Sequence, residues 1–355
     1  MRLILVISSL QAGGAERYLS RLANYWVEKG HEITLVTFEK KGTKPFYHLD
    51  KKVNLVQLDL FAKGSSKIGG TFEILKRLTI LRRFFKKNKP DRIISFVDIT
   101  NITVLFATLF LKTPVIVSER TTPQCYPIGE LYDCLRKILY PKAGVVVVQT
   151  KTAASYFSLK NIKIIANSVA KPMHQKRGWA EITKVCSAGR LIPSKAFDIL
   201  LKAFAGVLQK YPHLTLSFYG KGPEEQTLKA LTKSLKIEQN VAFKGAVSDI
   251  TKHLIEADLF IFPSNFEGFP NALCEAMSVG LPVIASNCSG NIDVVQDKKD
   301  GLLFPVGDIA TLEKAIITLI ENTSLREQLA QNAMNISTRF SEQEIFEKWD
   351  ELLYS

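Results

Sequence analysis

Short apolar runs alternate with amphipathic stretches along most of the chain. In the first half, the apolar runs predict β-strands at 3–8, 33–38, 53–57, 93–97, 114–118, 145–149 and 162–166. Apolar residues at helical spacing predict helices between them, at 14–29, 71–87, 99–111, 129–140 and 151–158. Nearly continuous runs such as Val145 to Val148 are typical of strands buried on both faces of a parallel sheet. The first half is therefore expected to be a doubly wound α/β unit.

The same alternation begins again near Lys184, after a stretch at 171–183 with the mixed Pro, Gly and charged composition of a linker. Strands are predicted at 184–188, 214–219, 241–244, 258–262, 282–285 and 302–304. Helices are predicted at 196–210, 223–235, 249–256, 271–279, 292–297 and 310–321. Two such series favour an α/β protein with two Rossmann-like, doubly wound domains, 1–170 and 171–338, facing across a cleft.

The last residues, 339–355, contain a clear helix start. Ser341-Glu342-Gln343-Glu344 is a capping box, and an amphipathic run follows it through Trp349 and Leu353. We expect this helix to pack back on the first domain.

Composition narrows the class of protein. With 355 residues, 46% hydrophobic and 23% charged, the chain is typical of folded domains and long enough for two. Five cysteines without CxxC spacing and five scattered histidines favour free thiols in a reducing cytosol over a zinc site. Met1 to Ser8 is interpreted as a first strand rather than a signal peptide. The longest apolar run, Ile102 to Leu111, is too short to span a bilayer.

The net charge of +13 is unevenly distributed. Residues 1–170 hold 27 Lys and Arg against 12 Asp and Glu, whereas the remaining residues hold 20 against 22. The first half is thus expected to meet an anionic partner: a membrane surface, nucleic acid or a polyphosphate. The helix predicted around 73–89 would turn Ile74, Leu75, Leu78, Leu81 and Phe85 to the sheet. Its opposite face would lie on anionic lipid through Lys76, Arg82, Arg83, Lys86 and Lys87. A merely solvated face is the alternative.

The most informative segment runs from Glu267 to Glu275, where two carboxylates stand eight positions apart. A Gly-Phe-Pro-Asn turn separates the first from a helix that begins at Asn271. A helix start is a plausible seat for phosphate, and carboxylates beside it suit the hydroxyls of a sugar or ribose. This combination indicates a nucleotide-sugar site, with a buried structural role for Glu275 as the alternative.

Three further loops follow predicted strands. Gly189-Arg190-Leu191 with Lys195 offers two cations that could clamp a diphosphate, and Gly220-Lys221-Gly222 lets backbone approach a ligand. Gly13-Gly14 is not part of GxGxxG, and we expect no acidic residue at the end of the next strand in the dinucleotide-binding manner. Plain turns or a solvated basic loop are the alternatives. Because Asp-x-Asp is absent, Arg and Lys rather than a metal are expected to neutralise the phosphates.

Taken together, these residues resemble the family 4 retaining glycosyltransferases, which have the GT-B fold and act in bacterial surface polysaccharide or lipid-linked oligosaccharide synthesis. The match runs nearly the whole length, and its most specific part is the Glu267–Glu275 motif. The resemblance implies catalytic roles for Arg190, Lys195 and Glu267. It implies donor binding by Gly13, Gly14, Gly189, Gly220, Gly222, Gly268, Phe269, Asn271, Ala272 and Glu275. It implies acceptor or sugar contacts for Glu16, Arg17, Glu119 and Arg120, although many members have His where Arg120 stands.

The expected reaction moves a hexosyl or N-acetylhexosaminyl unit from a nucleotide diphosphate sugar, UDP-linked, to a glycan or polyprenyl-diphosphate-linked acceptor. It would retain configuration and require neither cofactor nor metal. The enzyme would lie on the cytoplasmic face of the inner membrane, with an anionic membrane surface and no nucleic acid as partner. The alternatives are a nucleotide-sugar epimerase or hydrolase of the same fold, and a basic binding module without catalysis.

Overall fold

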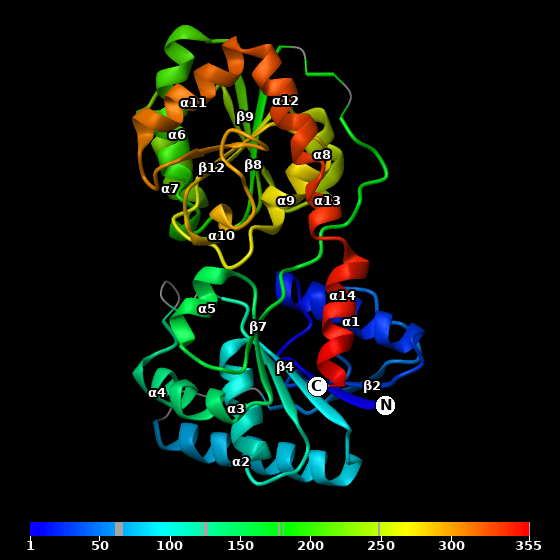
Figure 1. The fold of residues 1–355 in the computed structure, drawn as a ribbon. Coiled ribbons are helices and arrows are strands. Elements are labelled where there is room, and N and C mark those ends of the chain that lie inside the picture. Colours follow the sequence, from blue (N-terminus) through cyan, green and yellow to red (C-terminus); the bar gives the residue numbers. More distant parts are fainter. Residues whose placement is uncertain are drawn as a thin grey trace. The chain divides into compact units, whose positions relative to one another are not determined.

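The computed structural model describes residues 1–60, 67–121, 123, 127–176, 178–179, 181–247 and 249–354, with only the backbone over 67–74. Its contacts divide the chain into two compact units (Figure 1). Unit 1 comprises Met1–Asn167 and Ile345–Ser355, and unit 2 comprises Ser168–Glu344. The first boundary falls after residue 167, three residues before the one expected from the sequence.

Unit 1 is built on a parallel sheet with the strand order β3-β2-β1-β4-β5-β6-β7. Its strands are β1 Arg2–Val6, β2 Glu32–Thr37, β3 Asn54–Gln57, β4 Arg92–Phe96, β5 Val115–Ser118, β6 Val145–Val148 and β7 Ile162–Ile164. The register pairs Leu5 with Leu35 on one side and Ile94 on the other. All seven strands lie where the apolar runs predicted them.

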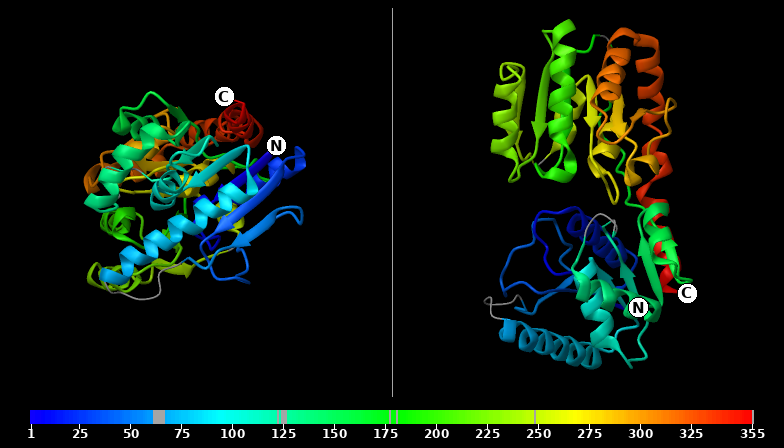
Figure 2. Two further views of the ribbon diagram at one scale, coloured as in Figure 1. Left: turned by 90° about the horizontal axis from the view of Figure 1, so that it is seen from below. Right: turned by 90° about the vertical axis from the view of Figure 1, so that its left-hand side faces the viewer.

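Helices cover both faces of this sheet (Figures 1 and 2). They are α1 Gly14–Glu28, α2 Lys67–Asn88, α3 Asp98–Thr108, α4 Glu130–Leu139, the short 3-10 helix Tyr140–Lys142 and α5 Lys151–Phe157. In α2, Leu81 and Phe85 are buried in the core, as the helical spacing predicted. Leu75 is 62% exposed, so its prediction was wrong, and the side chain of Ile74 lies outside the described residues.

One of the basic residues predicted to lie on lipid has another function. Nη1 of Arg82 donates to the carbonyls of Ala107, at 3.0 Å, and Leu109, at 2.6 Å. Nη1 of Arg82 thus satisfies the last carbonyls of a neighbouring helix. The residue is partly exposed, and contact of its other donors with lipid headgroups stays a prediction. The spacing of charges could not reveal this, because the partner carbonyls lie 25 and 27 residues away.

The final helix, α14 Glu342–Leu353, begins at the capping box, where the Glu344 amide donates to Oγ of Ser341 at 3.3 Å. Its apolar face packs on α1. Trp349 donates to the hydroxyl of Tyr18 at 2.8 Å, and Trp26 donates to Asp350 at 2.7 Å. Residues 345–355 are therefore part of the core of unit 1.

Unit 2 repeats the architecture with the strand order β10-β9-β8-β11-β12-β13, again fully parallel. Its strands are β8 Lys184–Ala188, β9 Thr215–Tyr219, β10 Val241–Gly245, β11 Leu259–Phe262, β12 Val283–Ser286 and β13 Leu302–Phe304. Because β8 pairs with both β9 and β11, the strand order reverses at β8. Ligands of open α/β sheets bind outside the carboxyl ends of the strands at such a point.

The helices of unit 2 flank this sheet. They are the 3-10 helix Pro193–Lys195, α6 Phe197–Lys210, α7 Glu225–Ser234, α8 Ile250–Glu256, α9 Asn271–Ser278, α10 Ser289–Ile292, α11 Ile309–Glu321, α12 Thr323–Ala333 and α13 Ile336–Arg339. The helix predicted at 292–297 was wrong, since α10 ends at Ile292. Helices α12 and α13 were not predicted from the sequence, and α13 packs against α9.

Two expectations from composition can be compared with the described part of the chain. There, Cys134, Cys186, Cys274 and Cys288 are free thiols, and Cys125 lies outside the described residues. No helix in the same residues combines the length and the apolar character needed to cross a bilayer.

Candidate active site

Two of the three predicted catalytic side chains, Lys195 and Glu267, meet beyond the carboxyl ends of β8 and β11. Nζ of Lys195, from the loop after β8, lies 2.5 Å from Oε1 of Glu267, from the loop after β11. The Lys195 side chain is 17% exposed and that of Glu267 10%. Nζ also lies 4.9 Å from the ring centroid of Phe262. The structure thus joins two residues 72 positions apart in a nearly buried ion pair.

Backbone contacts hold the two loops together around this pair. The amide of Asn265 donates to the carbonyl of Ser194 at 2.8 Å, and its side chain donates to the carbonyl of Pro193 at 3.4 Å. Such contacts fix the backbone on either side of Lys195 and Glu267. An ammonium has three donors, so one on Glu267 leaves Lys195 able to donate to an anionic ligand as well. Arg190, on the same loop, is exposed.

The predicted glycines allow the loops after β8 and β9 to touch. Gly220 has φ +145°, and a Cβ there would lie 1.9 Å from the carbonyl oxygen of Gly189. A Cβ on Gly222 would lie 2.2 Å from the carbonyl oxygen of Leu191. No side chain fits at these distances, so the glycines are required by close approach of backbone to backbone. Their structural role is clear, and their contact with a ligand stays a prediction.

Helix α9 begins directly after the Gly268-Phe269-Pro270 turn and carries Glu275 on its second turn. The amide of Asn271 donates to the carbonyl of Phe269 at 3.0 Å, so this amide, predicted to bind the donor, is already engaged in the turn. The Phe269 side chain is buried and meets the ring of Phe340 edge-on, with centroids 5.5 Å apart. Glu275 is partly exposed, and Ala272 follows Asn271 in the first turn of α9.

Helix α10, which contacts the backbone and the Cβ of Glu267, was not predicted as part of the site. A Cβ on Gly290, in α10, would lie 2.6 Å from Cβ of Glu267 and 2.7 Å from its carbonyl oxygen. Oγ of Ser289 donates to that same carbonyl at 3.3 Å. The signal available in the sequence was Gly290 itself, a glycine shortly after the strand at 283–286. It was not used because the next helix was predicted too late, at 292–297, which left Gly290 in a loop.

In unit 1, the Gly13-Gly14 loop follows β1 and opens α1, and the Glu16 carboxylate folds back over it. A Cβ on Gly13 would lie 2.0 Å from Oε2 of Glu16. Arg17 is the next residue of this first turn, and both are partly exposed. Glu16 thus places a carboxylate at the start of its own helix, where the dipole favours negative charge.

An acidic residue does follow β2, contrary to the expectation from the sequence. Glu39 is buried and accepts hydrogen bonds from Oγ of Ser9, the amide of Leu10 and the side chain of Gln11, at 3.1, 3.0 and 2.8 Å. This carboxylate holds the loop before Gly13 rather than a ribose. The signal was present in the sequence, directly after the strand at 33–38.

Glu119 was predicted to contact acceptor or sugar, and the structure corrects this. Its side chain is fully buried and accepts hydrogen bonds from Tyr140 at 2.8 Å and Thr121 at 3.0 Å. Nη1 of Arg136 lies 3.6 Å from its Oε2. Glu119 therefore holds the 3-10 helix and α4 to the end of β5 from inside unit 1.

Arg120 is also turned into unit 1. Its guanidinium lies 4.3 Å from the ring centroids of both Tyr18 and Phe96, and Nη1 donates to Asn167 at 2.7 Å. Nε and Nη2 are buried as well. Burial lowers the pKa of Arg120 to about 10, which leaves it charged at neutral pH. The cation–π contacts tie the end of β5 to α1 and β4, and the hydrogen bond ties it to Asn167. Arg120 is partly exposed, and its contact with a sugar stays a prediction.

Glu119 predicts a pH dependence of stability. Burial, with the nearby Asp98, raises the pKa of Glu119 to about 6. A carboxyl whose pKa is raised by folding contributes stability below its ordinary pKa and loses that contribution as pH rises through 6. Between pH 4.5 and 7.5 the free energy of unfolding should fall by about 2 kcal/mol relative to Glu119→Gln. Urea titrations in a Trp179→Phe background, followed by fluorescence of Trp26 and Trp349 in unit 1, measure it. Parallel pH profiles for both proteins would contradict it.

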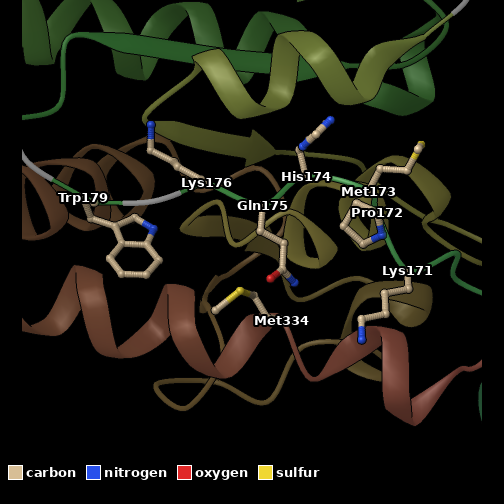
Figure 3. Close-up of a pocket in the computed structure, with 9 residues that line it drawn as sticks. Lys171, Pro172, Met173, His174, Gln175, Lys176, Trp179 and Met334 are labelled. Carbon is tan, nitrogen blue, oxygen red and sulfur yellow. The ribbon is translucent and has the colours of Figure 1, made fainter.

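A pocket of unit 2 lies away from these residues. Its volume is about 610 Å³, and it is lined by linker residues and by Met334 (Figure 3). The linker residues are Lys171, Pro172, Met173, His174, Gln175, Lys176, Gly178 and Trp179. Trp179 closes one wall and donates to the carbonyl of Gly280 at 2.7 Å. The pocket contains none of the predicted site residues. Among the residues that the structure describes, no three His, Cys, Asp or Glu side chains are grouped closely enough to hold a metal ion.

Comparison with known proteins agrees with this division of the chain. Residues 13–165 match the glycosyl transferase 4-like domain, and residues 171–336 match the glycosyl transferases group 1. These ranges correspond to units 1 and 2.

Full-length relatives extend the match. The chain is 30% identical to the GalNAc-alpha-(1->4)-GalNAc-alpha-(1->3)-diNAcBac-PP-undecaprenol alpha-1,4-N-acetyl-D-galactosaminyltransferase of Campylobacter jejuni, over 99% of this chain and 98% of that protein. It is 29% identical to an uncharacterized glycosyltransferase of Haemophilus influenzae, over 96% of each chain.

The fold has solved counterparts. HepE of Anabaena, solved in complex with UDP, superposes with a TM-score of 0.82 over 100% of both chains, at 21% identity. The fold, the two domain matches and the full-length relatives all favour a glycosyltransferase. They do not favour the alternatives, an epimerase, a hydrolase or a binding module. The chain therefore belongs to the group 1 glycosyltransferases, with a 4-like first domain and the GT-B fold, and is a glycosyltransferase.

Proposed function

We propose that this enzyme transfers a hexosyl or N-acetylhexosaminyl unit from a UDP-linked sugar to a polyprenyl-diphosphate-linked or polysaccharide acceptor. The observation that carries the donor half is the Lys195–Glu267 pair at the strand-order reversal of unit 2. The acceptor half is supported by the Campylobacter relative, whose name specifies an undecaprenol-diphosphate-linked glycan. We further propose that configuration is retained and that no metal takes part.

The chemistry follows from where charge develops. As the bond between the sugar C1 and the phosphate oxygen breaks, negative charge grows on the diphosphate and positive charge on the ring. Lys195 and Arg190, with the start of α9, would stabilise the leaving diphosphate, because preorganised charges lower the barrier most where charge appears. The departing phosphate oxygen would accept the proton of the acceptor hydroxyl, so that no side chain has to act as base.

Glu267 and Glu275 have different parts in this proposal. Glu267 accepts from Lys195 and so fixes the ammonium beneath the diphosphate, while its remaining lone pairs can accept from the sugar hydroxyls. Glu275, partly exposed on the second turn of α9, would accept from the ribose hydroxyls. Gly13, Gly14, Glu16 and Arg17 of unit 1 are proposed to meet the acceptor or the diphosphate.

The experiment that tests the proposal has two stages. Calorimetry with a panel of nucleotide diphosphate sugars should find one that binds, with UDP-linked sugars tightest. That sugar is then offered with lipid-linked diphosphate acceptors, and the product anomer is determined by NMR, with and without EDTA. Release of nucleotide without an acceptor, an inverted product or loss of transfer in EDTA would each overturn the corresponding part.

We also propose that unit 1 works against the cytoplasmic face of the inner membrane. The support is its basic excess and the exposure of Lys76, Arg83, Lys86 and Lys87 on α2. Each basic residue held near anionic lipid contributes about 1 kcal/mol.

A further inference from the structure

The turn after α3 presents an aromatic side chain to solvent in an unfavourable backbone conformation. Phe110 is 96% exposed and has φ +64°. The left-handed conformation costs a residue with a Cβ roughly 1 kcal/mol, and glycine or asparagine would avoid most of that cost. Neither burial nor backbone preference therefore favours phenylalanine at this position.

The turn is firmly held in spite of this exposure. Arg82 donates to the carbonyls of Ala107 and Leu109, on one side of Phe110, and the amide of Leu111, on the other side, donates to the carbonyl of Thr108 at 2.8 Å. Phe106, in the last turn of α3, is 43% exposed. A partly buried arginine thus fixes a tip whose apolar side chains point to solvent.

The charges around this tip have one sign. Lys86 lies one helical turn after Arg82 on α2, Lys112 follows the tip, and both are exposed. Arg83 and Lys87 are exposed beside them. Between residues 75 and 121 the acidic residues are Asp91, Asp98 and Glu119, of which Asp98 and Glu119 are buried. Asp91 accepts from the amide of Arg2 at 2.7 Å.

Topology places these residues at one edge of the sheet. Helices α2 and α3 pack side by side, and each leads directly into the next strand, β4 and β5. Their carboxyl ends therefore lie at the amino edge of the strands. Phe106, Phe110 and the basic residues gather there, on the opposite edge from the Gly13-Gly14 loop after β1.

We propose that the Phe110 turn inserts into the interface of an anionic membrane, with Arg83, Lys86, Lys87 and Lys112 on the headgroups. Exposed aromatic side chains ringed by cations bind at the boundary between headgroups and acyl chains, through apolar burial and attraction to anionic lipid together. Because the residues around the tip are positively charged, an anionic lipid surface fits it better than an uncharged apolar partner. This inference rests on the proposed membrane-proximal function and adds the residues that enter the bilayer.

The test is fluorescence quenching by brominated lipid. Phe110→Trp in the full chain is mixed with vesicles of phosphatidylcholine and 30% phosphatidylglycerol with brominated acyl chains, and its emission should shift to the blue and be quenched. The native Trp26 and Trp349 are fully buried. Trp179 is partly exposed and is replaced by Phe in every protein measured, so that the native background stays constant. The matched control is Phe46→Trp. The Phe46 side chain is 62% exposed, and its amide donates to the carbonyl of Leu10, which places it near the carboxyl edge of the sheet, away from Phe110. The control should not be quenched.

A second variant measures the contribution to binding. Phe110→Asn suits the left-handed conformation, so the fold should persist, and co-sedimentation with the anionic vesicles should weaken about tenfold. Charge reversal at Lys86 and Lys112 should weaken it further. Vesicle binding without quenching of the Phe110→Trp protein would overturn the proposal. It would also be overturned if the unchanged protein sediments as a dimer and Phe110→Asn as a monomer, because the Phe110 turn would then contact a second copy of the chain. Calorimetric binding of the nucleotide sugar, measured without vesicles, shows separately whether the proposed donor site fails.

Discussion

Lys195→Ala is expected to lower kcat/KM for the nucleotide sugar by two to three orders of magnitude. The ammonium is the nearly buried charge that the proposed mechanism places against the leaving diphosphate, and removing one preorganised charge of this kind costs about 3–4 kcal/mol in the transition state. Its loss also leaves Glu267, 2.5 Å away, without this cation in a site where its side chain is 10% exposed. Steady-state kinetics with the best donor of the panel measures the effect.

A double-mutant cycle with Glu267→Gln separates the two contributions. If Glu267 works by holding Lys195, the double variant should lose about as much as Lys195→Ala alone, because directly paired residues are not additive. Lys202→Ala is the matched control, since Lys202 makes a 2.9 Å pair with Asp198 at the exposed surface of α6. It should leave kcat/KM unchanged. Additive losses for Lys195 and Glu267 would contradict a coupled pair.

The sequence predicted the fold well because the dominant signal was local. Apolar runs such as Val145–Val148 locate every strand of both sheets, and short loops between strands and helices leave few possible topologies. The three site loops of unit 2 were also predictable. Each follows a parallel strand, and the carboxyl ends of such strands meet at one edge. Gly189, Lys195 and Glu267 came together for that reason.

What failed depended on distant partners. The family resemblance implied acceptor or sugar contacts for Glu119 and Arg120, which follow the strand at 114–118. Their partners in unit 1, Tyr140, Arg136 and Asn167, lie 17 to 47 residues away. Arg82 was predicted to face the membrane because it lies on the basic face of its helix. The sequence does not show that it also donates to Ala107, on α3, and Leu109, directly after it. The sequence pattern shows which element a charged residue follows or belongs to, but not which distant residue its side chain contacts.

Gly290→Ala is expected to reduce activity through Glu267 without touching the ligand itself. The new methyl would lie 2.6 Å from Cβ of Glu267 and 2.9 Å from its carbonyl carbon, so the Glu267 loop must move. Since Lys195 and the start of α9 are fixed to this loop, a displacement near 1 Å should lower kcat about a hundredfold. The stability of unit 2 should fall by about 1–3 kcal/mol, as for overpacking of a well-filled site.

Two comparisons decide whether Gly290 acts by positioning. Gly144→Ala is the control for a glycine-to-alanine change, because its nearest neighbour, the carbonyl oxygen of Val115, would lie at 3.4 Å, an ordinary contact. It should leave kcat unchanged. Combining Gly290→Ala with Glu267→Gln should cost little beyond Glu267→Gln alone, since the methyl acts on a residue already impaired. A full, additive loss in the double variant would show that Gly290 serves the site by a route other than Glu267, most directly by contact of α10 with the donor.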